Sequence, residues 1–412
     1  MESAIALSVP VFLLLMAVEL GVNVARTGES GYTLQDTLNN LACGIGQQLF
    51  GVAFKTATAA AYLYLYARTP LRLPEGWPGF LIALVTTDFC YYWFHRAGHR
   101  VNLVWAGHAV HHQSEEMNLS VALRQSWFVQ AVAWVFYLPL AALGLAPELF
   151  VAANLTTTLY QFWIHTEAIR KAPRAFEWLF NTPSHHRVHH GTNPRYLDAN
   201  YAGLLMLWDR LFGTFVPEEE EVVYGTVAPL RSWDPLWANL TYVAGFLRLA
   251  GRAPRWWQKL WAPFAPPEWR PAELGGPVTA PPVTRAAQVK YSAQASPATG
   301  AYVSAQFVPA LVIATLLLGF HRQLGAGPAF AVAVWVFLTL QAVGGLLESR
   351  PWARPLELAR LALLLALAAW LAPGAWGLVP LAWAALSVLA LTAAPIAPAG
   401  RQGVLARAGP SV

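Results

Sequence analysis

The sequence predicts an all-α protein that crosses a membrane several times. Of its 412 residues, 56% are hydrophobic and 12% are charged, whereas a soluble domain is about 45–50% apolar and about 25% charged. The apolar residues are also gathered into continuous runs. A run of about 20 apolar residues is long enough to cross about 30 Å of hydrocarbon as a helix.

Five apolar runs lie before residue 165. They are Ile5–Ala25, Leu41–Tyr66, Phe80–Phe94, Trp127–Leu145 and Glu148–Ile164. No basic segment precedes the first run, so we interpret it as a membrane helix rather than a signal peptide. Only a short turn around Gly144 and Pro147 separates the last two runs, which predicts a hairpin. Arg68 and Arg72 would fall on the far side of the membrane, which favours a re-entrant arrangement of the second and third runs.

After residue 250 the sequence predicts an extended linker followed by a second set of membrane spans. Residues 251–300 contain nine prolines and no apolar period, which indicates an extended linker. Four more apolar runs follow between Val303 and Ala394, giving about nine spans in total. We therefore expect three regions: a membrane domain at 1–250, a Pro-rich linker at 251–300, and C-terminal transmembrane helices at 301–412.

The distribution of charge predicts the orientation and the partners. Eleven Lys and Arg lie between residues 166 and 260, and basic loops face the cytosol in membrane proteins. The net charge of +5 fits an anionic membrane surface, so we expect the lipid bilayer as a partner and no nucleic acid. The composition, rich in Ala and Arg, is typical of bacteria, which places an integral protein in the inner membrane.

Ten of the eleven histidines form four clusters, and only His321 stands apart. The clusters are the HxxxH pair His95 and His99, the HxxHH set His108, His111 and His112, the single His165, and the set His185, His186, His189 and His190. Helix residues three and four apart share a face, so each cluster can aim its rings at one cavity. Cys43 and Cys90 lie in apolar runs and provide no CxxC metal site.

This pattern predicts a di-metal centre on the cytosolic face. Neutral imidazole suits iron, zinc, copper and nickel, and nine imidazoles exceed the four ligands of a structural zinc site. We expect the ligands His95, His99, His108, His111, His112, His165, His186, His189 and His190. His185 faces about 100° away from His186 on a helix, and whether it is a ligand stays open.

Polar residues beside these clusters are candidates for orienting the ligands. A ligating histidine usually donates its second N–H to a carboxylate or a carbonyl. Glu167 follows His165, and Asp198 and Asn200 follow the last cluster. We predict a catalytic supporting role for these three residues, and backbone carbonyls can serve the remaining rings.

The clusters and their flanking residues resemble the sterol desaturase and fatty acid hydroxylase superfamily of membrane di-iron oxygenases. The similarity covers roughly residues 30–245 and is carried by the following segments: His95-Arg-Ala-Gly-His99, Ser114-Glu115, Arg124-Gln-Ser126, Gln161-Phe-Trp-Ile-His-Thr-Glu167, Asn181-Thr-Pro-Ser-His-His-Arg-Val-His-His-Gly191 and Trp208-Asp-Arg-Leu-Phe-Gly-Thr-Phe215. These flanking residues are most similar to the ether-lipid-cleaving branch. In relatives of that branch an acidic residue often follows the second histidine, where this chain has Arg100.

The resemblance implies an oxygen-dependent lipid monooxygenase with a membrane lipid as substrate. Two iron ions and O2 would hydroxylate the carbon next to the ether oxygen of an O-alkyl glycerolipid, and the hemiacetal would collapse to a fatty aldehyde and a glycerol derivative. Tetrahydrobiopterin is the reductant in the animal branch. The electron donor of this chain and its oligomeric state stay open, as does the role of the C-terminal helices.

Two alternatives remain. Within the same enzyme class, the substrate would be another lipid, such as a sterol, a carotenoid or a fatty acyl chain. In a different class, histidine clusters occur in membrane metal transporters. Transport predicts ionisable residues along several spans, and the four C-terminal runs have few of them.

Overall fold

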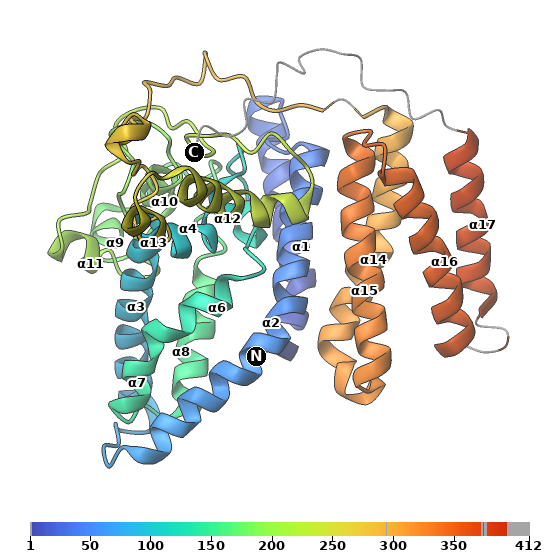
Figure 1. Ribbon diagram of the computed structural model, residues 1–412. Coiled ribbons are helices and arrows are strands. Elements are labelled where there is room, and N and C mark those ends of the chain that lie inside the picture. Colours follow the sequence, from blue (N-terminus) through green and yellow to red (C-terminus); the bar gives the residue numbers. More distant parts are fainter. Residues whose placement is uncertain (1, 294, 372–373, 375–376, 394–412) are drawn as a thin grey trace.

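Long helices run through the molecule, and most of the shorter helices gather at one end of it (Figure 1). The computed structural model describes residues 2–293, 295–371, 374 and 377–393. The long helices are α1 (Glu2–Thr27), α2 (Leu34–Arg68), α3 (Gly76–Arg100), α8 (Pro147–Tyr160), α14 (Pro297–Leu324), α15 (Ala326–Leu347), α16 (Ala353–Leu371) and α17 (Leu378–Ala393). The described part of the chain contains isolated β-bridges but no strand, which confirms the predicted all-α class.

The helices at that end carry most of the polar sequence. They are α4 (Asn102–Ala106), α5 (Ala109–His112), α9 (Arg174–Leu179), α10 (Pro183–His189), α11 (Leu207–Leu211), α12 (Pro235–Arg252) and α13 (Trp256–Trp261). Proline occupies the first turn of α8, α10, α12 and α14, where its fixed φ suits a helix and its missing N–H costs nothing. The side chains of Asp234 and Ser296 cap α12 and α14.

Three helices of the described residues are long and apolar enough to cross a membrane, namely α1, α14 and α15. The count of about nine spans is therefore too high by this measure. The run Trp127–Leu145 breaks into α6 (Val129–Ala133), a 3-10 turn and α7 (Leu138–Ala142). Helix α8 has 14 residues, which at 1.5 Å per residue gives about 21 Å, less than the hydrocarbon thickness.

The first helices and the C-terminal helices share one apolar core. Leu38, Leu41 and Ile45 on α2 pack with Phe307 on α14 and Leu340 on α15, all of them buried. Helix α14 also lies against α1. Helices α14 and α15 therefore pack directly on the N-terminal helices α1 and α2, while residues 394–412 of the expected C-terminal region lie outside the described residues.

The segment between the two sets of helices makes specific contacts with the N-terminal part. It contains α13 and a 3-10 turn at Ala272–Leu274, and residue 294 lies outside the described residues. Arg285 donates to the carbonyl of Val222 at 2.7 Å and pairs with Glu167. Lys290 reaches Glu116 at 2.6 Å, and the backbone N–H of Tyr291 donates to Glu115 at 2.6 Å. This segment is thus fixed across the polar end of the molecule.

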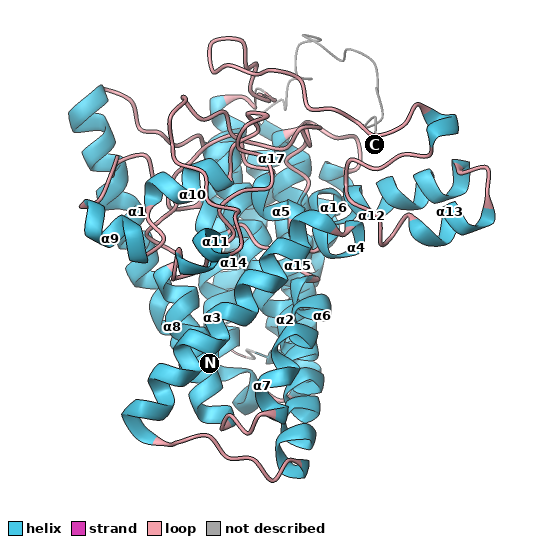
Figure 2. Cartoon of the chain, turned by 90° about the vertical axis from the view of Figure 1, so that its left-hand side faces the viewer, coloured by secondary structure: helices cyan, strands magenta, loops and turns pink. Residues whose placement is uncertain are grey.

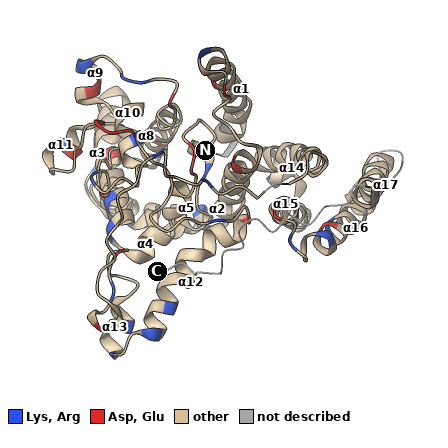
Figure 3. Cartoon of the chain, turned by 90° about the horizontal axis from the view of Figure 1, so that it is seen from above, with Lys and Arg blue, Asp and Glu red and all other residues tan. Residues whose placement is uncertain are grey.

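Helix α13 projects sideways from that polar end (Figure 2). Its Trp256, Trp257 and Trp261 side chains are exposed, and Lys and Arg are found along α12 and α13 (Figure 3). Tryptophan and basic residues together are typical of the membrane–water interface. This position places the short helices at one membrane surface.

One buried ion pair lies inside the C-terminal helices. Arg360 and Glu357 on α16 contact at 2.5 Å, and both are almost completely buried. Tyr302 on α14 donates to Glu357 at 2.5 Å, and Arg360 donates to Gln306 at 2.8 Å. The pair therefore joins α14 to α16 through charge-assisted hydrogen bonds.

We predict that Arg360→Leu destabilises the protein by about 3–5 kcal/mol, because it leaves the Glu357 carboxylate buried without its cation. Unfolding of the purified protein in detergent, followed by circular dichroism, measures this change. The double variant Glu357→Leu/Arg360→Leu removes both charges and should recover most of the loss. Equal destabilisation of the single and double variants would contradict this account.

Candidate metal centre

The structure brings nine histidines together in two groups at the polar end of the long helices. His95, His99, His108, His112 and His189 form one group, and His111, His165, His186 and His190 form the other. In each group the nearest ring nitrogens all lie within 4.8 Å of one another. Eight of the nine side chains are buried, and Nε2 of the ninth, His99, is buried as well.

Three helices and one turn supply these rings. His95 and His99 lie in the last turns of α3, and α5 with the residue before it carries His108, His111 and His112. His165 follows α8. The last cluster occupies α10 and its C-terminal residue. The spacings of three and four therefore place each cluster on one helix face, as predicted.

Backbone carbonyls hold the outer nitrogen of four rings. His95 Nδ1 donates to the carbonyl of Tyr201 at 2.7 Å, and His165 Nδ1 donates to that of Gln161 at 2.7 Å. His111 and His189 make the same contact with Arg124 and Ala199, each at 3.0 Å. A proton on Nδ1 leaves Nε2 with a free lone pair directed toward the centre.

Within each group the Nε2 atoms of neighbouring rings come within about 3 Å of one another, close enough to share a cation. Nε2 of His108 lies 2.9 Å from Nε2 of His95 and 3.1 Å from Nε2 of His112. In the other group, Nε2 of His165 lies 2.8 Å from that of His186 and 3.1 Å from that of His111. His111 and His165 both carry their proton on Nδ1, so their two Nε2 lone pairs face each other at 3.1 Å, and a metal ion between them would satisfy both. His99 Nε2 and His189 Nε2 have no hydrogen-bond partner although they are buried, so the donor set fits metal ions.

Burial keeps the imidazoles in the neutral form that binds metal. It lowers the pKa of His111 to about 4. Burial, reinforced by the neighbouring histidines, holds the pKa values of His112 and His190 well below their usual range. These rings are therefore uncharged at neutral pH.

Two buried aspartates fix the loop that supplies the carbonyls of Ala199 and Tyr201. Asp88 on α3 accepts from the backbone N–H groups of Leu204 and Leu205, at 2.7 and 3.0 Å, and from the Trp208 indole at 2.9 Å. Asp209 accepts from the N–H groups of Tyr201 and Ala202, both at 2.8 Å. Because the Tyr201 carbonyl orients His95, these carboxylates act on the centre through the backbone.

The three predicted supporting residues occupy different places. Asn200 is buried, and its amide donates to the carbonyls of His185 and Val216 at 3.1 and 2.8 Å. Asp198 and Asn200 both adopt left-handed backbone conformations, with φ of 59° and 57°, which aims the carbonyl of Ala199 between them at His189. Asp198 itself forms an ion pair with Arg100. Arg100 stands where relatives often have an acidic residue, and Asp198 supplies a carboxylate beside it.

Glu167 lies beside His165 in sequence but contacts other residues. It pairs with Arg285 and accepts from the Tyr224 hydroxyl at 2.7 Å. Among the described residues, no hydrogen bond joins the side chain of Glu167 or Asp198 to a ring of the nine histidines. His185 is outside both histidine groups, and its ring lies 3.3 Å from the Thr182 hydroxyl.

Sequence reasoning missed Glu19, a buried carboxylate on the membrane helix α1. It accepts from the hydroxyls of Tyr32 and Thr166 and from the N–H of Leu119 at 2.8 Å. Thr166 follows His165 directly, so Glu19 ties α1 to the centre. An acidic residue inside the apolar run Ile5–Ala25 was the available sign, because such residues are rare in membrane helices unless they have a role.

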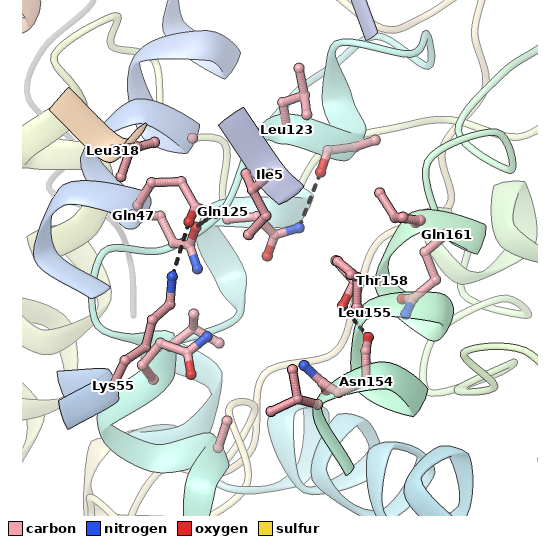
Figure 4. A pocket seen from close by; sticks show the side chains of 18 of the residues that line it. Ile5, Gln47, Lys55, Leu123, Gln125, Asn154, Leu155, Thr158, Gln161 and Leu318 are labelled. Atoms are coloured by element: carbon pink, nitrogen blue, oxygen red, sulfur yellow. Dashed lines mark hydrogen bonds between the residues drawn. The ribbon is translucent and has the colours of Figure 1, made fainter. Parts of the chain in front are cut away.

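A cavity of about 630 Å³ leads from the centre into the membrane part of the molecule. His108, His111 and His165 line one end of it, so the cavity reaches both histidine groups. Most of its wall is apolar, with amides of Gln47, Gln125 and other residues among the apolar side chains (Figure 4). A long apolar cavity that ends at clustered imidazoles is suited to a lipid chain.

Comparisons with known proteins agree with this site. Residues 80–214, which contain all nine histidines of the two groups, match the fatty acid hydroxylase family. Alkylglycerol monooxygenase of Xenopus tropicalis is 37% identical over 361 residues, 86% of this chain and 79% of the relative. The Homo sapiens enzyme is 37% identical over 362 residues, 85% of this chain and 79% of the relative. Ornithine lipid hydroxylase OlsE of Rhizobium tropici is 26% identical over 194 residues, 45% of this chain and 58% of that protein. No solved structure matches the chain.

The fold, the histidine groups and these matches define an oxygen-dependent lipid monooxygenase embedded in a membrane. Within that class, the chain belongs to the alkylglycerol monooxygenase family. The resemblance seen in the sequence is thereby confirmed. The transporter alternative does not agree with these findings.

We predict that Asp88→Asn lowers metal affinity about 10–100-fold, the usual cost of disturbing residues that orient ligands. The variant weakens the acceptor for three N–H donors and loosens the loop that carries the carbonyl of Tyr201. Metal retained after dialysis against a chelator measures the effect. Glu148→Gln changes an exposed carboxylate on α8 and should retain metal as the wild type does. Unchanged retention in Asp88→Asn would contradict the indirect role.

We also predict that the metal-free protein loses stability as the pH falls below about 6.5. The buried histidines have pKa values below the unfolded value of about 6.5, so in this range the unfolded chain binds more protons than the folded one. Each such histidine can contribute up to about 1.4 kcal/mol per pH unit between pH 6.5 and its folded pKa. Thermal unfolding in detergent at pH 7.5 and 5.0 tests this, and an unchanged midpoint would argue against buried neutral rings.

Proposed function

We propose that the chain hydroxylates the carbon next to the ether oxygen of O-alkylglycerol lipids. The observation that carries this proposal is the cavity that ends at His108, His111 and His165 in a chain that aligns along most of its length with alkylglycerol monooxygenases. Two iron ions are the proposed metals, O2 is the oxidant and tetrahydrobiopterin is the proposed reductant.

Nine histidines are the proposed ligands, five for one ion and four for the other. They are His95, His99, His108, His112 and His189 for the first, and His111, His165, His186 and His190 for the second. Imidazole suits iron, and no described carboxylate joins the two groups. Bound iron would supply the oxidising power that attack on an unactivated C–H bond requires, since no side chain has it.

The protein's own residues position the lipid and exclude water. The apolar cavity wall binds the alkyl chain and places its ether end beside His111 and His165. The amides of Gln47 and Gln125 on the cavity wall offer hydrogen bonds to glycerol hydroxyls. Asp88, Asp209 and Asn200 hold the loop that fixes His95 and His189, and this is the supporting role that we assign to Asn200. Glu167 pairs with Arg285 and Asp198 pairs with Arg100, so we assign these two carboxylates a supporting role outside the histidine groups.

The reaction balances with one O2 and a two-electron donor. One oxygen atom enters the C–H bond as a hydroxyl group, and the other leaves as water with two electrons and two protons from the reductant. The resulting hemiacetal breaks its C–O bond to the glycerol oxygen. The products are a fatty aldehyde and a free glycerol hydroxyl.

We propose the cytosol as the side that the centre faces. Helices α12 and α13, which carry exposed tryptophans and basic residues, lie at the same end as the histidine-bearing helices α5 and α10 (Figure 2), and basic loops face the cytosol. In a bacterium the membrane would be the inner membrane. Residues 1–250 form the proposed di-iron oxygenase domain, 251–300 the linker and 301–412 the C-terminal helices.

A second candidate substrate is another membrane lipid. The similarity to an ornithine lipid hydroxylase favours hydroxylation of an acyl chain as the alternative. The same centre and cavity would serve it, because the position of the chain decides which carbon reacts.

We predict that membranes containing the protein release fatty aldehyde from 1-O-alkylglycerol in the presence of O2 and reduced tetrahydrobiopterin. His186→Ala should abolish release, because it removes one of four clustered imidazoles. His321→Ala is the matched control, since this histidine lies on α14 outside both groups, and it should retain activity. No aldehyde from wild-type protein that carries about two irons would refute the ether-lipid substrate.

A further inference from the structure

The C-terminal helices take part in the wall of the cavity. Five residues of α14 line it, namely Leu311, Ala314, Thr315, Leu318 and Arg322. Their spacing of three and four residues places them on one face of the helix. Helix α14 is therefore part of the site and not only an anchor.

A neighbouring stripe of α14 does not line the cavity. Val308, Val312, Leu316 and Phe320 recur every four residues, and each is between 51% and 58% exposed. An exposed apolar stripe on a membrane helix is the face expected against lipid. The two faces of α14 thus separate the cavity from the bilayer.

Helix α1 continues this wall. Ile5, Val9, Phe12 and Leu13 line the cavity from α1, and α1 lies beside α14. Apart from Arg322 and the Thr315 hydroxyl, every side chain on these two lining faces is apolar. Thr315 donates its hydroxyl to the carbonyl of Leu311 at 2.8 Å, so the hydroxyl is already satisfied within the helix.

The amides of the cavity come from other elements. Gln47 and Gln48 lie on α2, Asn154 lies on α8, and Gln125 precedes α6 (Figure 4). The wall formed by α1 and α14 is thus the apolar side of a cavity whose other side carries hydrogen-bonding groups.

The cavity is long enough to hold one alkyl chain. It extends along α8 from Pro147 to Gln161 and His165, and 14 helical residues correspond to about 21 Å. One lipid tail occupies half of a hydrocarbon core of about 30 Å. The cavity can therefore hold a complete alkyl chain with its ether end at the histidines.

We propose that α14, together with α1, holds the alkyl chain of the lipid and determines which chain lengths the enzyme accepts. The identity of the lipid in this inference rests on the proposed function. The assignment of α1 and α14 as a wall that binds an apolar chain does not depend on it. It gives the C-terminal helices a role in substrate selection.

Two variants of α14 test the proposal. Thr315→Phe adds bulk on the cavity face, and Leu316→Phe makes a similar addition on the exposed face of the same helix. Aldehyde release from dodecyl- and octadecylglycerol is compared in proteoliposomes. Thr315→Phe should lower kcat/KM for the longer chain about ten-fold or more relative to the shorter one, the size of effect that a few methylenes have in an apolar pocket. Leu316→Phe should leave the ratio unchanged.

A variant that enlarges the cavity and a measurement of lipid binding test the proposal independently of the first two variants. Leu318→Ala widens the same face and should shift preference toward the longer chain. Bound metal in each variant reports whether the centre has formed. An octadecylglycerol with a diazirine at the chain end should label α1 and α14, as mapped by mass spectrometry, and unlabelled lipid should compete.

The results separate the two proposals. Labelling of α1 and α14 without aldehyde release would overturn the proposed reaction and keep the chain-binding wall. Aldehyde release with labels confined to other helices would overturn the wall and keep the reaction. An equal change of both chain lengths in Thr315→Phe and Leu316→Phe would also overturn it.

Discussion

The nitrogens of nine imidazoles share one small buried volume, and much of the surrounding structure depends on this constraint. Neutral rings with free lone pairs repel one another at about 3 Å, so they stay in place only if something else fixes them. Carbonyls at Tyr201, Ala199, Arg124 and Gln161 perform that role by accepting from Nδ1. The orientation of these four rings is therefore determined by backbone position.

Buried carboxylates act on the backbone and not on the rings. Asp88 and Asp209 accept five N–H groups between them from the chain segment 201–208, and Glu19 holds Thr166 beside His165. These carboxylates therefore position the histidines through the backbone segments that they hold.

The histidines and the apolar part of the cavity lie at different levels along the long helices. The polar end contains the histidines and the short helices, and the segment with Arg285 and Lys290 crosses it. The apolar end contains the cavity, which α1, α2, α8 and α14 all line. Because the cavity meets both histidine groups, an apolar chain inside it would reach the imidazoles from the membrane side.

The sequence by itself determined the helical class, the membrane location and the nine clustered histidines. Those features depend on composition and on spacings of three and four residues, which a helix converts directly into a shared face. Only the tertiary structure decided how the histidines divide into groups of five and four, since His165 and His186 meet across 21 residues. It also showed Asp88, Glu19 and α14 at the site, because their partners lie far away in sequence and no local pattern records such contacts. The span count was too high for a related reason: hydropathy records apolar runs, but the packing around Trp127–Leu145 breaks one run into short pieces.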